Sequence, residues 1–248
     1  MFTLKGSKKP GKEVIKNLFY FNENQMLDCN QYIIKNDENG NLTLFDAGNG
    51  ISLKGLFQGM KDVNLDYTKI NNIYLTHEHV DHVLGLYFLL DEIDGSEINI
   101  HAFGETAKIL SQGDESKIFP GNLGISASMF GIEINPLEVN ELKKSSKVAI
   151  GPEFKFEIYH VPGHSLGSIA YYEPEKKVLV PGDVVFTGGS FGRYDFPGGD
   201  LETLKNSIAR INSLDVTYLL PGHMGISSRG NEQIQLSLRM INSIGSYF

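Results

Sequence analysis

The chain has 248 residues, of which 41% are hydrophobic and 21% charged, and its formal net charge is -8. This length and composition are enough for a globular core of normal size. The acidic balance argues against a nucleic-acid partner, which needs a basic face, and against anionic membrane surfaces. No stretch approaches the roughly 20 apolar residues of a membrane helix. We therefore expect a small-molecule substrate, with no nucleic acid and no membrane as partner.

Cys29 is the single cysteine, so no intrachain disulfide can form. A chain of this kind is typical of a reducing compartment. The N-terminal residues lack an apolar run long enough for a signal peptide. These observations predict a cytoplasmic protein. We expect Cys29 itself to be a small core residue in a strand, far from any motif.

The first hundred residues predict an alternation of strands and helices. The Asn39-Gly40 pair suits a tight hairpin between the first two strands. Apolar periodicity and β-branched runs then give the remaining elements. The predicted strands are 27–35, 42–45, 70–75 and 97–101, and the predicted helices are 52–63 and 83–93.

Residues 102–150 predict a loop-rich insertion that begins with a short helix, GETAKILSQ. Loops of this length in compact domains are commonly lids or binding elements. We expect this insertion and the 188–199 loop to wall the substrate pocket, with homodimer formation as the alternative role. The apolar residues expected to form the wall are Ile118, Phe119, Leu123, Ile125, Met129 and Phe130.

The second half repeats the strand-rich pattern. Strands are predicted at 154–161, 169–172, 178–180 and 216–220. Asp200 and Asn231 are each expected to cap a helix that follows with apolar residues on one face. Strands followed by a helix, twice over, predict two similar layered halves.

Four of the predicted strands run into histidine or aspartate. Three of them share an apolar–Pro–Gly–His/Asp pattern, in which proline ends the strand and glycine permits a sharp turn. In extended chain His77 and His79 point the same way and can share one metal ion, whereas Asp81 and His82 lie past the bend and can face a second. Five of the seven histidines belong to this set: His77, His79, Asp81, His82, His164, Asp183 and His223.

Imidazole and carboxylate ligands suit zinc, iron or manganese. Concentrated at strand ends, they predict a metal site where active sites collect in layered α/β folds. The other two histidines, His101 and His160, lie within predicted strands. We expect them to pack against neighbours or to support the ligands from behind.

The H-x-H-x-D-H pattern with the later His, Asp and His resembles the metallo-β-lactamase superfamily. The resemblance covers most of the chain and implies an α/β fold, a four-layer αββα sandwich forming a single domain over 1–248. It implies that His77, His79 and His164 bind the first of two divalent metal ions. It further implies that Asp81, His82 and His223 bind the second and that Asp183 bridges both. Zinc is the expected metal, with iron or manganese as alternatives.

The loop Gly188–Asp200, GGSFGRYDFPGGD, is similar to glyoxalase II-like (hydroxyacylglutathione hydrolase-like) members, which hydrolyse glutathione thioesters. Glyoxalase II proper continues into a helical domain that holds glutathione. Here only 25 residues follow His223, enough for one helix. The resemblance therefore predicts hydrolysis of a thioester or ester and leaves glutathione open.

In this interpretation a water molecule near two metal ions loses its proton near neutral pH. Asp81 is the predicted catalytic residue, which orients the water and takes its proton. Asp46 in LFDAG resembles a family residue that supports the ligands from behind; an ordinary turn aspartate is the alternative.

Other readings compete with this one. Gly163–Gly167 fits the G-x-S-x-G elbow, with Ser165, Asp183 and His223 in serine-hydrolase order. The elbow needs a following helix, whereas SIAYY predicts a strand, so we reject it. HEHVDH is not H-E-x-x-H, because its fifth residue is Asp81. A mononuclear iron persulfide dioxygenase, a flavodiiron-like module, and a lactonase or phosphodiesterase of the same fold stay open.

Overall fold

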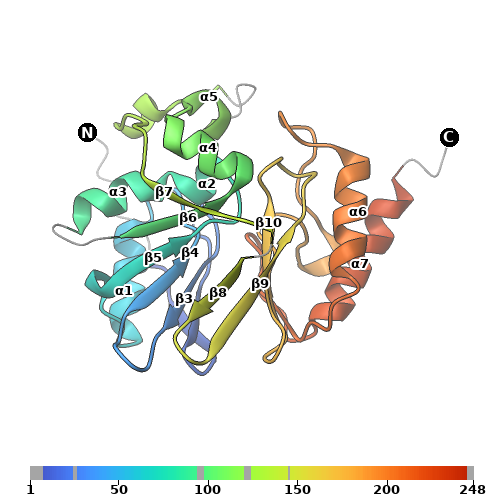
Figure 1. The fold of residues 1–248 in the computed structure, drawn as a ribbon, viewed down its shortest axis with the longest axis horizontal. Helices are drawn as coiled ribbons and strands as arrows, with labels where there is room; N and C mark the ends of the chain where they lie inside the picture. The colour runs from blue at the N-terminus through green and yellow to red at the C-terminus, as the bar shows by residue number, and fades with distance from the viewer. Residues whose placement is uncertain (1–7, 25–26, 94–97, 120–123, 145, 245–248) are drawn as a thin grey trace.

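Two β-sheets lie face to face with helices on both outer sides (Figure 1). The computed structural model describes residues 8–24, 27–93, 98–119, 124–144 and 146–244. Within these described residues, the first sheet has seven strands and the second has five, and in both sheets strands consecutive in the chain are neighbours. The predicted α/β class with four αββα layers is confirmed.

The first sheet is antiparallel from β1 to β4 and parallel from β4 to β7. Its strands are β1 (Gly11–Ile15), β2 (Leu18–Phe21), β3 (Gln31–Lys35), β4 (Leu42–Phe45), β5 (Ile70–Tyr74), β6 (Asn99–Phe103) and β7 (Val139–Leu142). The second sheet is antiparallel except where β11 runs parallel to β12. Its strands are β8 (Lys147–Ile150), β9 (Phe154–His160), β10 (Ile169–Glu173), β11 (Val178–Val180) and β12 (Tyr218–Leu219).

Helices cover the outer face of each sheet (Figure 1). Those packed on the first sheet are α1 (Leu53–Asp62), α2 (Val80–Val83), α3 (Gly85–Glu92), α4 (Gly104–Gln112) and α5 (Glu115–Ile118). Those packed on the second are α6 (Leu201–Ile211) and α7 (Gly230–Ser243). Single 3-10 turns lie at Tyr67–Lys69, Ala127–Phe130 and Thr187–Gly189.

Strand alternation divides the buried residues among three hydrophobic cores. On β3, Ile33 faces the helices and Ile34 faces the other sheet, as the two-residue period requires. Between the sheets, the Phe45 ring lies 5.3 Å from that of Phe156 and 5.1 Å from that of Tyr171. These contacts fix one sheet on the other, so the strand ends that carry the functional residues meet at one edge.

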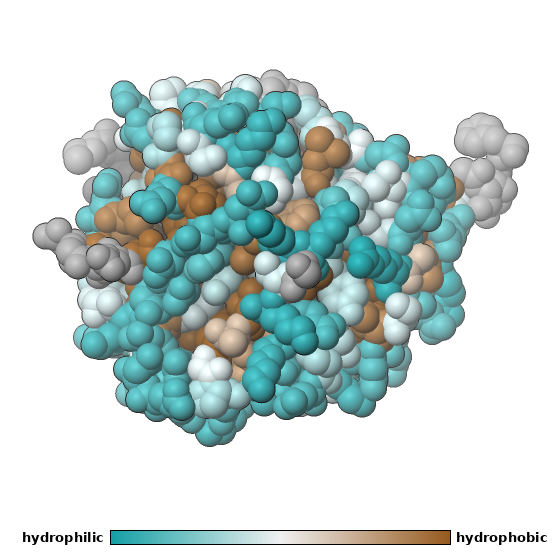
Figure 2. All heavy atoms as spheres, viewed as in Figure 1, coloured by the Kyte–Doolittle hydropathy of each residue, from teal (hydrophilic) through white to brown (hydrophobic). Residues whose placement is uncertain are grey.

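The face of the molecule drawn in Figure 2 is largely polar. Figure 2 shows hydrophilic residues over most of one face, with hydrophobic residues in separate areas between them. Among the described residues, no helix is long and apolar enough to cross a membrane.

The N-terminal region differs most from expectation. Strands β1 and β2 were not predicted, and the strand expected from Leu27 begins only at Gln31. Residues 28–30 leave the ladder because their polar groups bind elsewhere: Asp28 contacts Lys9, and Asn30 contacts the loop after β12. The expected tight turn at Asn39-Gly40 is a six-residue connection from 36 to 41.

The 102–150 region is more ordered than predicted. It contains the expected helix α4 but also β7 and β8, which the sequence analysis missed. The chain passes here from the first sheet to the second. Ile118 and Phe119 are buried in the core of the first sheet, so they cannot form a pocket wall. Leu123 lies outside the described residues.

Two helix starts can be compared with prediction. Asp200 caps α6 as expected, and its side chain accepts a hydrogen bond from the Thr203 N–H at 2.7 Å. Asn231 does not cap α7, which begins one residue earlier. Its side chain instead accepts from the Val216 N–H at 2.6 Å, tying the helix to the start of the preceding strand. The predicted helix 83–93 is α3, with the short α2 before it.

Candidate metal centre

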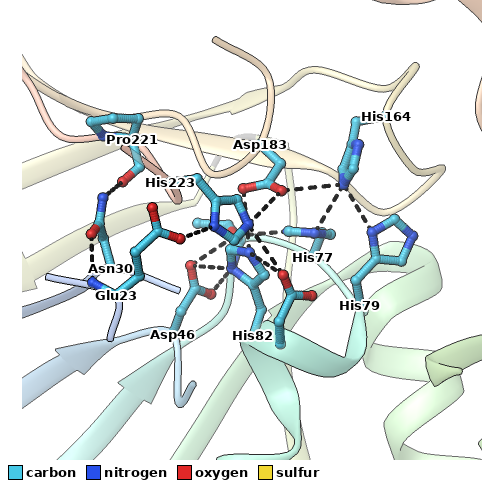
Figure 3. A network of polar contacts seen from close by, with 12 residues as sticks. Glu23, Asn30, Asp46, His77, His79, His82, His164, Asp183, Pro221 and His223 are labelled. Carbon is cyan, nitrogen blue, oxygen red and sulfur yellow. Dashed lines mark hydrogen bonds and ion pairs between the residues drawn. The ribbon is translucent and has the colours of Figure 1, made fainter. Parts of the chain in front are cut away.

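All seven predicted ligands lie at one edge of the two sheets, just after strands end (Figure 3). Strand β5 leads into His77 and His79, and α2 carries Asp81 and His82. Strands β9, β11 and β12 lead into the three Pro-Gly turns whose last residues are His164, Asp183 and His223. The donor atoms fall into two groups, each with all atoms within 4.8 Å of one another.

The first group consists of His77, His79 and His164. The Nε2 atom of His164 lies 2.8 Å from His79 Nδ1 and 3.2 Å from His77 Nε2. All three side chains are buried. Three imidazole nitrogens converging at these distances could together hold one divalent ion.

The second group consists of Asp81, His82, Asp183 and His223. His223 Nε2 lies 3.1 Å from a carboxylate oxygen of Asp81 and 3.1 Å from Asp183 Oδ2. Asp183 Oδ2 is also 3.7 Å from His164 Nε2 in the first group. Asp183 therefore lies between the two groups, as expected for a shared carboxylate.

Two buried polar atoms at this centre lack a hydrogen-bond partner among the residues that the structure describes, namely His82 Nε2 and Asp183 Oδ1. They face each other at 3.3 Å without forming a hydrogen bond. An unpaired buried donor or acceptor is costly, and a shared cation would satisfy both atoms. The residues present therefore fit a metal ion at this position.

Asp46 supports the ligands from behind, as the resemblance implied. Its Oδ2 atom lies 2.9 Å from His82 Nδ1 and accepts a 2.9 Å hydrogen bond from the Thr76 hydroxyl. The Thr76 hydroxyl in turn lies 3.0 Å from His77 Nδ1. In the first group, His164 Nδ1 lies 2.6 Å from the backbone carbonyl of Arg193. With Nδ1 protonated in each ring, Nε2 offers its lone pair to the centre.

Sequence reasoning missed Glu23 altogether. Its Oε2 atom lies 2.6 Å from His223 Nδ1, across 200 residues of chain. Glu23 follows β2, and nothing in the local sequence marks it as part of the site. Only the contact between Glu23 and the distant His223 identifies its role, and a single sequence does not reveal such a contact.

Burial and neighbouring charges set the protonation of the two groups. Burial lowers the pKa of His77 well below its usual range and that of His79 to about 3, so both rings are neutral. Burial also acts to lower the pKa of His223, but the charge of Asp183 and its hydrogen bond raise it above its ordinary value. The same negative potential attracts a cation to the second group.

The glycine before His223 is required by the close packing of this centre. A Cβ at Gly222 would lie 2.1 Å from Asp183 Oδ1 and 2.8 Å from a ring carbon of His82. Any other residue would displace the second group. The Pro-Gly pattern thus reflects space beside the ligands as well as turn geometry.

A cavity of about 270 Å³ opens over the donor atoms. Its floor is formed by ligand residues from both groups and its walls by apolar side chains and one arginine. The wall residues are Leu27, Val80, Phe186, Phe191, Gly192, Arg193 and Phe196. The 188–199 loop therefore walls the pocket as predicted. No described residue of the 102–150 region lines this cavity. Residues of α4 and α5, together with Pro197 and Gly198 of the loop, line a smaller cleft that also touches His79.

The remaining predicted residues serve the fold. His101 stacks on Tyr74 with ring centroids 4.3 Å apart, and His160 packs against Phe103 at 4.9 Å. Ser165 is buried and donates a hydrogen bond to Glu78 at 3.1 Å, so it lacks the histidine partner of a serine nucleophile among the described residues.

Cys29 is a buried core residue, as expected, but two details of its prediction were wrong. It lies outside a strand, and its sulfur is within 4.8 Å of donor atoms of Asp46 and His82. Burial raises the pKa of this thiol to about 11, so it stays protonated at neutral pH.

Comparison with curated proteins finds relatives of similar length. Hydroxyacylglutathione hydrolase GloC of Haemophilus influenzae is 33% identical over 201 residues, which make up 79% of this chain and 86% of that protein. A probable metallo-hydrolase of Methanocaldococcus jannaschii is 31% identical over 214 residues, or 81% of this chain and 89% of that protein.

Solved structures with a similar fold are consistent with these relatives. The BLEG-1 B3 metallo-beta-lactamase gives a TM-score of 0.66 at 27% identity, covering 87% of this chain and 95% of that one. TTHA1623 in a di-iron-bound form gives 0.63 at 29% identity, covering 85% and 94%. Residues 25–223 match the sequence profile of the metallo-beta-lactamase superfamily. With most of its length matched and its donor groups in place, the chain belongs to the metallo-beta-lactamase superfamily.

Proposed function

We propose that this protein is a dinuclear metal-dependent hydrolase of thioesters, of the glyoxalase II-like kind. The observation that carries the proposal is a pair of buried donor groups sharing Asp183 beneath a cavity with apolar walls. His77, His79 and His164 would hold one divalent ion. Asp81, His82 and His223 would hold the other. When bound, the pair supplies a Lewis acid for the carbonyl and lowers the pKa of a water molecule to about 7.

Asp81 is the proposed catalytic residue of this chain. It lines the cavity, and one of its carboxylate oxygens contacts His223 Nε2 at 3.1 Å. A carboxylate in that position can orient a water molecule toward the substrate and accept its proton. Burial acts to raise the pKa of Asp81, but the charge of His82 and the hydrogen bond of His223 lower it, so the group is ionised and able to act as a base.

The cavity walls suit a substrate with an apolar or sulfur-containing arm. Phe186, Phe191 and Phe196 provide aromatic surface, against which sulfur packs favourably. Arg193 adds one cationic group, which can pair with a carboxylate of the substrate. A thioester of an acidic thiol meets both requirements.

A relative bears on the identity of that thiol. Hydroxyacylglutathione hydrolase GloC, which is 33% identical and aligned over 86% of its length, is named for a glutathione thioester. On this basis a hydroxyacylglutathione is the substrate we propose.

The test is a substrate panel run on protein loaded with zinc, iron or manganese. It compares a hydroxyacylglutathione with the oxygen ester of the same acyl group, a lactone and a phosphodiester, with glutathione persulfide and oxygen uptake as the redox arm. We expect two metal ions per chain and a kcat/KM at least ten times higher for the thioester. One iron per chain with oxygen uptake, or faster lactone or phosphodiester cleavage, would refute the proposal.

A further inference from the structure

The carboxylate of Glu23 contacts both His223 and the residue after it, Met224. One oxygen lies 2.6 Å from His223 Nδ1 (Figure 3). The other accepts a hydrogen bond from the Met224 N–H at 2.8 Å. Both oxygens are thus committed to a single turn. Glu23 is part of the segment after β2, so two distant parts of the chain meet at this ligand.

Asn30 holds the two parts together. Its amide nitrogen donates to the carbonyls of Pro221 at 2.9 Å and Met224 at 2.7 Å. Its amide oxygen accepts from the Glu23 N–H at 2.9 Å. Asn30 is buried, so water does not compete for these bonds. The position of Glu23 is therefore fixed relative to the turn that carries His223.

The turn that carries His223 has an unfavourable backbone conformation, which its neighbours stabilise. Met224 has a φ of +66°, in the left-handed region that residues other than glycine seldom occupy. Its N–H and C=O are bound by Glu23 and Asn30, respectively. Such conformations persist where surrounding contacts determine them, and they cluster at functional sites.

We propose that Glu23 is the positioning residue for His223 and thereby controls binding of the second metal ion. Its carboxylate accepts a hydrogen bond from the His223 Nδ1–H, which fixes the tautomer of that ring. The Nε2 lone pair is then directed toward the ion that His223 would hold together with Asp81 and Asp183. Among the described residues, the Glu23 carboxylate hydrogen-bonds to His223 and Met224 and to no ligand of the first group, so we expect its effect to be specific to the second ion. The inference rests on the metal centre of the proposed function.

The experiment is a zinc titration against a competing chelator, without substrate. Glu23→Ala removes both contacts. Glu23→Gln keeps an oxygen for the Met224 N–H but loses the charged acceptor for His223. The control is Glu38→Ala, which removes the same charge from the exposed β3–β4 connection at the far end of the hairpin from Asp46. We expect the second-ion affinity to fall by about 10- to 100-fold in both Glu23 variants, with first-ion affinity and the control unchanged.

A loss of affinity confined to the second ion indicates that Glu23 positions His223. A merely structural role of Glu23 would weaken the binding of both ions. If Glu23→Ala fails to fold, Glu23→Gln decides. Wild-type affinity for both ions in Glu23→Gln would overturn the proposal, as would equal losses for the two ions. Because no substrate is used, a wild-type chain that binds two zinc ions but cleaves no thioester would refute the proposed substrate and leave the assignment of Glu23 standing.

Discussion

The two donor groups differ in what stands behind their histidines. In the first group, His77 and His164 contact neutral oxygens, namely the Thr76 hydroxyl and the Arg193 carbonyl. In the second, His82 and His223 each contact a carboxylate, from Asp46 and Glu23. A carboxylate acceptor makes an imidazole a stronger electron donor than a neutral oxygen does.

The difference teaches how negative charge is distributed across the centre. The second group has two carboxylates among its donors, Asp81 and Asp183, and two more behind them. The first group has three imidazoles and no carboxylate of its own, and it lies next to the shared Asp183. Asp46 is the link between them, because its Oδ2 atom also accepts from Thr76, which contacts His77. The two donor groups therefore differ in charge but are connected by the hydrogen bonds of Asp46 and Thr76.

Removing all metal would deprive both donor groups of their function and gives the largest expected effect. We expect dialysis against a strong chelator to eliminate hydrolysis and added zinc, iron or manganese to restore it, because the donor set has no other source of an activated water. Activity and metal content are measured on the same samples. Full activity in protein shown to be free of metal would contradict the assignment of the centre.

Asp183→Ala tests whether the two groups share a ligand. A carboxylate between two cations contacts both and offsets part of their repulsion, so its loss weakens both sites. We expect a larger loss of metal than in any single histidine variant, and a fall in kcat/KM beyond the roughly 100-fold of residues behind the ligands. Metal stoichiometry is the measurement, with His164→Ala as the comparison. Retention of two ions at full affinity would show that Asp183 is not shared.

Asp46→Asn tests the link between the groups. Asparagine keeps the size of the side chain but presents an NH2 group where one carboxylate oxygen accepts from both Thr76 and His82. We expect the affinity for both ions to fall by about 10- to 100-fold, whereas Glu23 variants affect only one. The same chelator competition measures both. A loss confined to the second ion would show that Thr76 does not transmit the effect.

Much of this centre could be predicted because its donors are marked locally. Each of His164, Asp183 and His223 follows a strand and a Pro-Gly pair, and both signals lie within a few residues. The layered fold follows from the same periodicity, and Asp200 marks its helix through its own cap.

What could not be predicted depends on contacts between distant residues. Glu23 resembles any polar loop residue until the segments that follow β2 and β12 are brought together. Asn231 has the composition of a helix cap, but the free Val216 N–H offered a better partner outside the helix. Strands β7 and β8 are short and half-exposed, and pairing with β6 and β9 decides their conformation more than their own sequence does.

The smallest expected effect concerns the cavity wall next to the first group. The Arg193 backbone carbonyl contacts His164, while its guanidinium lies 4.1 Å over the Phe196 ring and pairs with Asp195 at 2.7 Å. Arg193→Ala keeps the carbonyl and removes only the cation, so both metal ions and kcat should be unchanged.

We expect Arg193→Ala to raise KM for a hydroxyacylglutathione by about tenfold, equivalent to about 1.4 kcal/mol. A charged hydrogen bond can exceed this value, but here the guanidinium is more than half exposed and Asp195 competes for it. Arg229→Ala, which breaks an exposed pair with Glu232 on α7, is the matched control. A thioester whose thiol lacks a carboxylate separates two roles for Arg193. If its KM rises equally, Arg193 acts by packing on Phe196; if its KM stays constant, Arg193 binds the carboxylate of the substrate.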